Sequence, residues 1–440
     1  MRIVRLLRKV LGRLLSGRSS GDQVTLLPEA EKESMWTRRL AALLCELGSA
    51  LLQAGETTEQ VTDTLRDVAA RYGVRARSFV VPTGLFVRVG DWGDEVVDFL
   101  PVDNAQLRLD QVQALYALVS RARADEIPIE DVRAELKTVR EMPSRVSPVA
   151  SIGGYMVLTV GLGLLQHPTW QAVAGWAVLG VGVGVLRLLG LRFPVLATAM
   201  PVVAAAAVTV VSLQWAGPLL HMPPEELLIP PLIAFLPGSA LTMGTMELAK
   251  GNMLAGVGRL ASGVNVLLLL AFGILVGSSI ATVHTALDGA SRNQVLVGWA
   301  PWAGVLLLGV GFLVFYSAQP KVLPWLVACL MIERAAQLAG TAMAGTAFGA
   351  FAAGLAIPLI SAFVERRTTT PAQVLFLPSF WMLVPGSVGL TGVSELVTGQ
   401  GSGAGDLLQT VIIVLAITLG ILVGASLLPM TRVEVESVTE

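Results

Sequence analysis

The sequence predicts a polytopic α-helical membrane protein, with ten transmembrane helices in two inverted five-helix repeats behind a small α+β cytoplasmic domain. Three observations support this fold class. Of the 440 residues, 54% are hydrophobic and only 14% are charged, against about 25% charged residues in soluble domains. Residues 1–147 carry 21 Lys/Arg and 21 Asp/Glu, whereas residues 148–440 carry 10 and 11. The apolar part also contains one Pro-Gly-Ser motif twice.

The two copies of this motif share seven identities at an offset of 148 residues. They are Pro230, Pro237-Gly238-Ser239, Gly244 and Glu247-Leu248, and then Pro378, Pro385-Gly386-Ser387, Gly392 and Glu395-Leu396. Proline removes a backbone donor and clashes one turn back, while glycine lets the chain leave helical geometry. Each copy is therefore predicted to break a membrane helix. Either copy alone could be a kinked packing helix, but paired breaks in two halves indicate a transporter's substrate site.

The N-terminal leader, residues 1–30, alternates basic and apolar residues with helical spacing over Met1–Leu15. It lacks the uninterrupted apolar core of about 7–15 residues that a signal peptide needs. Two interpretations remain open. The leader is either a helix lying on an anionic membrane surface or a disordered segment.

Residues 31–147 are predicted to form the cytoplasmic α+β domain. Two helices between Gly48 and Gly73 should join at Gly55, with Thr57 as N-cap and Gln60 completing a capping box. A β-hairpin should follow over 78–89 and 95–101, and then helices over 107–124 and 129–141. The acidic side chains that follow Gly55 have the spacing of a solvated helical face: Glu56, Glu59, Asp63 and Asp67.

From Pro148 onward, ten apolar segments are close to the roughly 20 residues that cross a bilayer. We expect them at 148–166, 169–190, 194–215, 227–248, 260–283, 297–317, 322–343, 345–364, 371–396 and 407–429. The repeats are then 148–290 and 291–430, with a cytoplasmic tail at 431–440. With the N-terminus inside, the positive-inside bias is strong, because the basic residues at cytoplasmic ends are Arg187, Arg192, Lys250, Arg259, Lys321, Arg366, Arg367 and Arg432. Only Arg292 falls outside.

The motifs fall in the fourth and ninth spans, and an odd offset of five spans reverses direction. The two breaks should therefore meet near the midplane of the membrane. Broken helix ends offer N–H groups to anions and carbonyls to cations, which suits a zwitterionic amino acid. The predicted substrate-binding residues are Pro237, Gly238, Ser239, Pro385, Gly386, Ser387, Arg334 and Asn265.

Three carboxylates are the candidates for proton coupling: Glu247, Glu333 and Glu395. Ionisable residues within membrane spans are costly and usually face the bundle interior. Glu247 and Glu395 lie near span ends, where solvation is the simpler explanation. Glu333 and Arg334 lie deeper, and each is expected to pair with another helix, either in a substrate site or in a structural ion pair. Arg259 and Asn265 could complete a polar track.

Several function classes are excluded or disfavoured. The sequence has no Gly-x-Ser-x-Gly, His-Glu-x-x-His or phosphate-binding Gly-Lys-Ser/Thr motif, which argues against an enzyme and against an ATP-driven pump. Cys45 and Cys329 lie in different domains, so neither a disulfide framework nor a metal site is expected. The net charge of −1 gives no indication of nucleic-acid binding. Four small-xxx-small pairs should pack helices: Gly180/Gly184, Gly273/Gly277, Gly345/Gly349 and Gly420/Gly424.

Residues 36–430 resemble the threonine/serine exporter family in organisation and in three segments. These segments are Gly48–Val61, Leu236-Pro237-Gly238-Ser239 with Glu247-Leu248, and Val384-Pro385-Gly386-Ser387. The resemblance implies export of threonine and serine from the cytoplasm, driven by the proton-motive force. Related two-chain versions handle dicarboxylates, so the family does not fix the substrate.

We therefore expect a secondary transporter of the cell membrane that exports small hydroxy amino acids by proton antiport. Its partners would be the amino acid, protons and the lipid bilayer, without a cofactor, and a homo-oligomer is compatible with the sequence. A dicarboxylate exporter is the alternative, in which Arg334 and Arg259 would matter most. A membrane-anchored hydrolase is a further alternative, although the soluble segment 30–145 contains no histidine.

Overall fold

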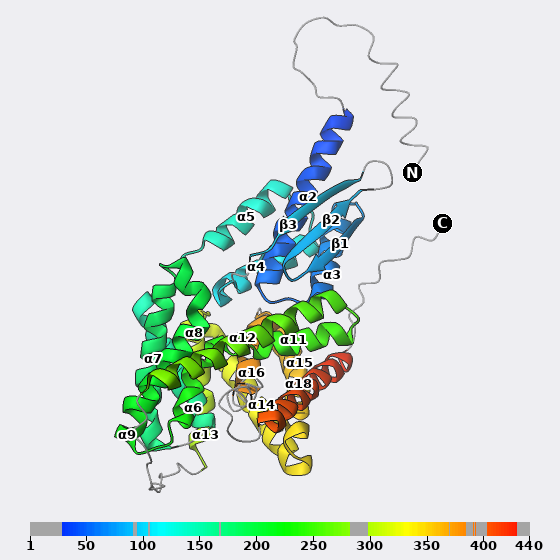
Figure 1. The fold of residues 1–440 in the computed structure, drawn as a ribbon. Helices are drawn as coiled ribbons and strands as arrows, with labels where there is room; N and C mark the ends of the chain where they lie inside the picture. The colour runs from blue at the N-terminus through cyan, green and yellow to red at the C-terminus, as the bar shows by residue number, and fades with distance from the viewer. Residues whose placement is uncertain are drawn as a thin grey trace, which may run out of the picture.

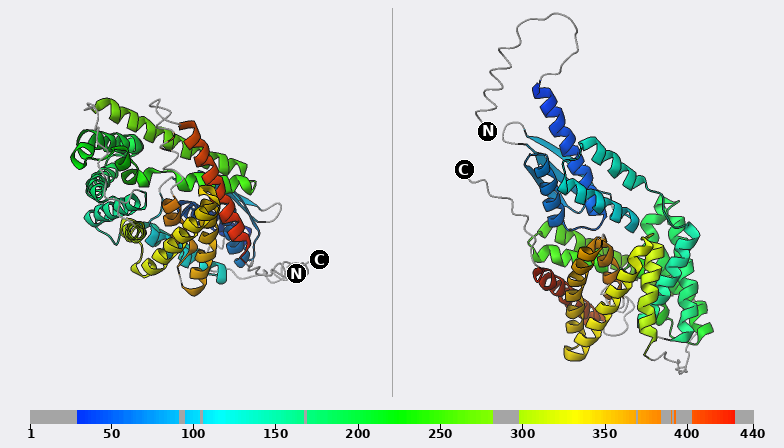
Figure 2. Two further views of the ribbon diagram at one scale, coloured as in Figure 1. Left: turned by 90° about the horizontal axis from the view of Figure 1, so that it is seen from below. Right: turned by 180° about the vertical axis from the view of Figure 1, so that it is seen from behind.

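The computed structural model describes residues 29–90, 95–103, 106–166, 169–281, 298–368, 370–383, 390, 392 and 403–428. An N-terminal α+β domain lies at one end of a larger, mostly helical part, as two opposite views agree (Figures 1 and 2). Each part has its own hydrophobic cluster, but Leu109 and Val112 of the N-terminal domain belong to the cluster of the helical part. The two parts are therefore packed together and not merely tethered.

Four helices build the N-terminal domain: α2 (Glu29–Gln53), α3 (Thr58–Arg71), α4 (Leu109–Ala124) and α5 (Ile129–Glu141). The predicted N-cap is confirmed, because the backbone N–H of Gln60 donates to Thr57 Oγ1 at 3.3 Å. Gly55 and Gly73 have φ of 92° and 70°, a conformation that favours glycine. The sharp turns at both ends of α3 therefore follow directly from the sequence.

The predicted hairpin is wrong in one respect, because its first strand is two strands. β1 (Ala76–Val81), β2 (Gly84–Val89) and β3 (Val96–Pro101) form an antiparallel sheet in the order β1-β2-β3. The chain reverses between Val81 and Gly84, which are register partners. Pro82, which has no N–H to donate to a ladder, stands in this turn. The turn predicted between residues 89 and 95 lies mostly outside the described residues.

The described residues contain seven helical segments long and apolar enough to cross a membrane. They are Pro148–Gln166 (α6), Trp170–Gly190 (α7), Val195–Leu220 (with α8, Pro194–Val211), Met253–Ile280 (α12), Pro320–Ala344 (with α14, Leu323–Ala344), Thr346–Arg367 (α15) and Gly405–Ser426 (within α18, Gly403–Ser426). Each coincides with one of the ten predicted segments. The prediction of a polytopic helical membrane protein is thus confirmed at this level.

The remaining three predicted segments do not reach that length among the described residues. Two are the shorter apolar helices α13 (Ala300–Phe315) and α16 (Ala372–Leu383). The fourth predicted span is interrupted and consists mainly of the 3₁₀-helix η2 (Pro230–Phe235) and the helix α11 (Gly238–Ala249). The number of ten spans therefore stays a prediction.

Helices α6 and α13 cross closely through glycines. A Cβ placed on Gly161 would lie 2.5 Å from the backbone nitrogen of Leu308, and one on Gly311 would lie 2.4 Å from that of Leu158. Such distances are too short for a larger residue, so the backbones touch. The contacts are reciprocal. Gly161 contacts Leu308, and the positions 150 residues after 161 and 150 residues before 308, Gly311 and Leu158, contact each other.

The predicted glycine pairs mostly pack helices. A Cβ on Gly273 or Gly277 of α12 would meet carbonyl oxygens of α8, and one on Gly420 or Gly424 of α18 would meet carbonyl oxygens of α15. Gly345 is the exception. It separates α14 from α15 with φ of 87° and has open space around it, so its role is to turn the chain.

Candidate functional site

The first Pro-Gly-Ser motif breaks its helix as predicted. The 3₁₀-helix η2 ends at Phe235, Leu236 is extended, and α11 begins at Gly238. Pro237 and Gly238 are buried and Ser239 is half-buried. The first N–H groups of a helix have no partner within it, so the start of α11 presents amide groups inside the protein. This is the arrangement that binds anionic groups at helix N-termini.

Aromatic residues hold the segment that precedes the break. Tyr155 of α6 donates its hydroxyl to the carbonyl of Pro231 at 2.7 Å. The guanidinium of Arg187 lies over three rings, at 4.9 to 6.0 Å from their centroids: Phe315, Phe235 and Tyr155. Cation–π contacts of this kind are strengthened when desolvated. Arg187, predicted only as a charge at a cytoplasmic end, therefore fastens η2 to its neighbours.

The helix that starts at the break contacts the second half of the chain. α11 packs against α12, and also against α16 and α18. α16 leads into the second motif and contains its first residue, Pro378, which is buried. The core of that motif, Pro385-Gly386-Ser387, and Glu395 lie outside the described residues. The structure thus brings α11, which begins at the first break, into contact with the helix that leads into the second motif.

Glu333 is the most isolated polar side chain of this region. It lies on α14, is 0% exposed, and neither carboxylate oxygen has a hydrogen-bond partner among the described residues. The Ser379 hydroxyl of α16 faces the Glu333 carboxylate without meeting hydrogen-bond geometry, and it lies 3.9 Å from Cys329 Sγ. Burying an unpaired carboxylate is costly, so this side chain requires a proton or a bound cation.

Two other predicted residues do not join Glu333. Arg334 is half-buried and donates to Gln337 Oε1, one turn along its own helix, at 2.6 Å. The expected partner on another helix is therefore not the one observed. Asn265 is exposed on α12, so it does not line the interior beside Pro237. Sequence spacing alone could not assign these two side chains to a face.

Glu247 has a different environment from that expected for a solvated span end. It is 0% exposed, and it accepts three hydrogen bonds at 2.8 to 2.9 Å, from the Thr58 backbone N–H, the Thr58 hydroxyl and the Asn252 amide. Thr58 is the first residue of α3, and a negative charge is favoured at a helix N-terminus. Glu247 thus fastens the N-terminal domain to the end of α11.

Two further contacts reinforce this junction. Lys250 Nζ lies 2.6 Å from a carboxylate oxygen of Glu59. Arg259 of α12 donates to the backbone carbonyl of Glu56 at 2.9 Å. The predicted polar track through Arg259 is therefore directed toward the N-terminal domain.

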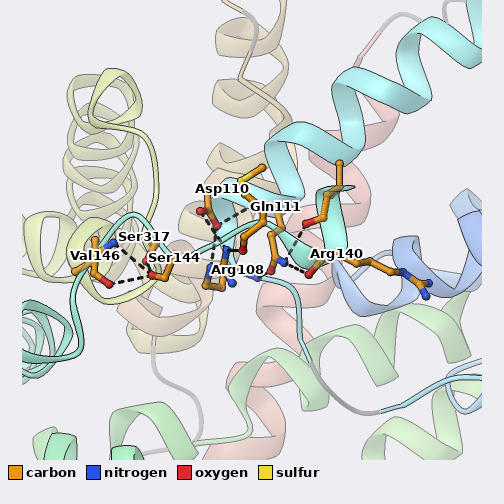
Figure 3. A network of polar contacts seen from close by, with 9 residues as sticks. Arg108, Asp110, Gln111, Arg140, Ser144, Val146 and Ser317 are labelled. Carbon is orange, nitrogen blue, oxygen red and sulfur yellow. Dashed lines mark hydrogen bonds and ion pairs between the residues drawn. The ribbon is translucent and has the colours of Figure 1, made fainter. Parts of the chain in front are cut away.

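A second junction joins the N-terminal domain to the end of α13 (Figure 3). The backbone N–H of Leu109 donates to the carbonyl of Tyr316 at 3.2 Å, and the hydroxyls of Ser144 and Ser317 are 2.9 Å apart. Arg108 forms an ion pair with buried Asp110 at 3.1 Å and so fixes the start of α4. The domain therefore contacts both halves of the helical part.

Glu56 overturns the expectation of a solvated acidic face. It is 5% exposed, accepts a hydrogen bond from the Tyr116 hydroxyl through Oε1, and has no hydrogen-bond partner at Oε2 among the residues that the structure describes. Burial raises the pKa of Glu56 to about 7, although Gln373, the Thr57 backbone and Arg259 act in the opposite direction. Glu59 and Asp63 are exposed, as expected.

Sequence reasoning missed Glu56, Thr58 and Arg187 as site residues. Two of them follow Gly55, whose positive φ ends one helix just before the next begins. Acidic and hydroxyl residues at such a point could have been recognised as a helix start facing a partner. No local signal distinguishes a helix start that faces solvent from one that faces another domain.

Comparisons with known proteins agree with this architecture. A family model of threonine/serine exporters, ThrE, matches residues 42–281. A second model, described as Threonine/Serine exporter, ThrE, matches residues 303–427. No curated protein and no solved structure matches the chain. Since the first match alone covers more than half of the chain, and the second extends it across the apolar helices, the chain belongs to the threonine/serine exporter family of membrane transporters.

Proposed function

We propose that this protein exports threonine and serine from the cytoplasm across the cell membrane by proton antiport. The observation that carries the coupling is Glu333, a fully buried carboxyl group without a hydrogen-bond partner, on a helix long enough to span the membrane. A group in that position is stable with a proton or a cation bound while it is buried, and it would release either one when a conformational change opens it to water. Both oxygens of Glu247 accept hydrogen bonds. Glu247 is therefore better assigned to docking of the N-terminal domain than to proton coupling.

The substrate would bind where the two helix breaks face each other. The start of α11 at Gly238 offers N–H groups for the substrate carboxylate, and α16, which contacts α11, leads to the second break. Pro237, Ser239 and the second motif, Pro385-Gly386-Ser387, complete this proposed site.

The reciprocal crossing of α6 and α13 supports two inverted repeats. Gly154 faces the Phe315 nitrogen and Gly304 faces the Leu165 nitrogen, so these contacts also exchange under a shift of 150 residues. A self-complementary contact of this kind is characteristic of a two-fold axis. Repeats related in this way alternate access by moving one bundle against the other.

Reconstituted vesicles test the proposal. Radiolabelled threonine should leave vesicles faster when an inward proton gradient is imposed, and Glu333→Gln should abolish the response to that gradient. An efflux rate that does not depend on the gradient would contradict coupling to protons. Stronger competition by succinate than by serine would favour the dicarboxylate alternative.

A further inference from the structure

A cleft of about 930 Å³ lies between the N-terminal domain and the junction of α15 with α16. The N-terminal domain contributes side chains from α3, α4 and the loop before α3. The opposite wall comes from the end of α15 and the start of α16. The cleft is therefore built by two parts of the chain that the sequence separates by about 250 residues. We call it the interdomain cleft.

One buried carboxylate in this cleft has an oxygen that no described hydrogen-bond donor reaches. Glu56 lines the interdomain cleft and is 5% exposed. Its Oε1 accepts from Tyr116, whereas its Oε2, which the Gln373 side chain faces, has no partner in hydrogen-bond geometry among the described residues. Leaving a buried acceptor unsatisfied is costly. Oε2 is shielded from solvent, so an external donor reaches it, and is bound favourably, once the facing Gln373 side chain moves aside.

The charges that line the cleft favour a cation. Its two arginines, Arg121 and Arg123, already form ion pairs with carboxylates of the N-terminal domain. The carboxylate of Glu365 also lines the cleft, opposite the N-terminal domain. Asp63, which also lines the cleft, is paired with Arg66. Once Glu56 is ionised, Glu56 and Glu365 leave an excess of negative charge, and a positively charged donor satisfies both the charge and the missing hydrogen bond.

We propose that the interdomain cleft binds the ammonium group of a free α-amino acid, with Glu56 Oε2 as its acceptor. The cleft is far larger than a bare metal ion requires. Gln60, Thr368 and Gln373 line it as well and offer hydroxyl and amide groups to the rest of a hydroxy amino acid. The identity of the ligand rests on the proposed function, since threonine and serine would be the amino acids at hand.

Occupation of the cleft would be sensed by both halves of the transporter. Arg259 of α12 holds the Glu56 carbonyl, while Glu365 and Gln373 belong to the second half. Binding strengthens with pH, because an ammonium group needs Glu56 ionised and burial raises its pKa to about 7. The polar and charged groups facing Glu56 are Tyr116, Gln373, Glu365 and Arg259.

Hydrogen exchange of the full chain in lipid nanodiscs tests this binding site. L-threonine and threoninol, which both carry an ammonium group, should slow exchange in peptides covering 56–64 and 370–376 by about threefold or more. The deaminated analogue 2,3-dihydroxybutyrate should not. Glu56→Gln should weaken the effect of L-threonine by about tenfold, and Glu126→Gln, which changes an exposed carboxylate of the same domain, should not weaken it.

The outcomes separate this inference from the proposed function. Vesicles that export threonine without protection of these peptides would overturn the binding site and leave the transport function standing. Protection of these peptides without export of threonine would support the binding site and contradict the transport function. Equal protection by the deaminated analogue, or by sodium or potassium chloride alone, would show that no ammonium group is recognised. The wild-type comparison does not depend on the folding of any variant.

Discussion

Glu247 and Glu333 are both 0% exposed, yet their surroundings differ completely. The two oxygens of Glu247 accept three hydrogen bonds, two of them from the first residue of α3. Those of Glu333 accept none within the described part of the chain. A satisfied buried carboxylate stabilises a fixed contact, whereas an unsatisfied one is stable only in a protonated or ligand-bound state. Burial alone therefore does not distinguish these two carboxylates; the number of hydrogen-bond donors that face each of them does.

The largest expected effect is the loss of stability caused by Glu247→Leu. The substitution leaves the Thr58 N–H and hydroxyl and the Asn252 amide without an acceptor, so the free energy of unfolding should fall by about 3 kcal/mol or more. Chemical denaturation in detergent micelles measures it. Thr58→Val, which removes only the hydroxyl donor, is the graded control, with a loss of about 1 kcal/mol.

Glu333→Leu makes the same change at the carboxylate without donors, and the opposite effect on stability is expected. Replacing an unpartnered polar group by an apolar one of similar size is nearly neutral or stabilising, so stability should change by less than about 1 kcal/mol or increase. The same denaturation experiment applies. A loss as large as that of Glu247→Leu would mean that Glu333 has a structural partner after all.

Transport separates the two residues in the other direction. Glu333→Gln keeps the shape of the side chain but cannot exchange a proton, so threonine export driven by a pH gradient should fall by about tenfold or more. Exchange of threonine against threonine, without net proton movement, should be retained. Glu247→Gln should instead retain the dependence on the gradient. If it loses that dependence, Glu247 takes part in coupling as well as in docking.

Glu56 is intermediate, with one oxygen partnered and one not, and it predicts a pH effect. Its folded pKa of about 7 exceeds the ordinary 4.5, so the folded protein binds a proton that the unfolded chain has released. The contribution of Glu56 to stability therefore falls as pH rises from about 5 to 7, by about 1 kcal/mol per pH unit, and is constant above. Glu56→Gln should lose this dependence. Melting temperatures at pH 5, 6, 7 and 8 test it, and Glu126→Gln should follow the wild type.

The smallest effect is expected beside Glu247. The ion pair of Lys250 with Glu59 spans 2.6 Å, but both side chains are partly exposed. Exposed pairs contribute about 0–1 kcal/mol. Lys250→Met should therefore lower the free energy of unfolding by less than about 1 kcal/mol, and added salt should reduce its difference from the wild type. A larger loss would place part of the docking energy in this pair, and not in the buried hydrogen bonds of Glu247.

Local chemistry accounts for most of what was predicted correctly. The N-cap at Thr57, the turns at Gly55 and Gly73 and the break before Gly238 all arise from backbone preferences of single residues. The turn at Pro82 is equally local, since proline cannot donate to a sheet ladder, but the β-rich composition on both sides of it favours a continuous strand. The shortness of α13 could not be foreseen, because apolar composition continues beyond its ends.

The sequence by itself determined the apolar segments, the first helix break and the family, because each depends on residues close together in the chain. Tertiary structure alone decided which carboxylates have donors. The partner of Glu247 lies 189 residues away, and the lining of the interdomain cleft comes from opposite parts of the chain. Hydrogen bonds act over about 3 Å, so only the folded arrangement could distinguish a docking residue from one left without a partner.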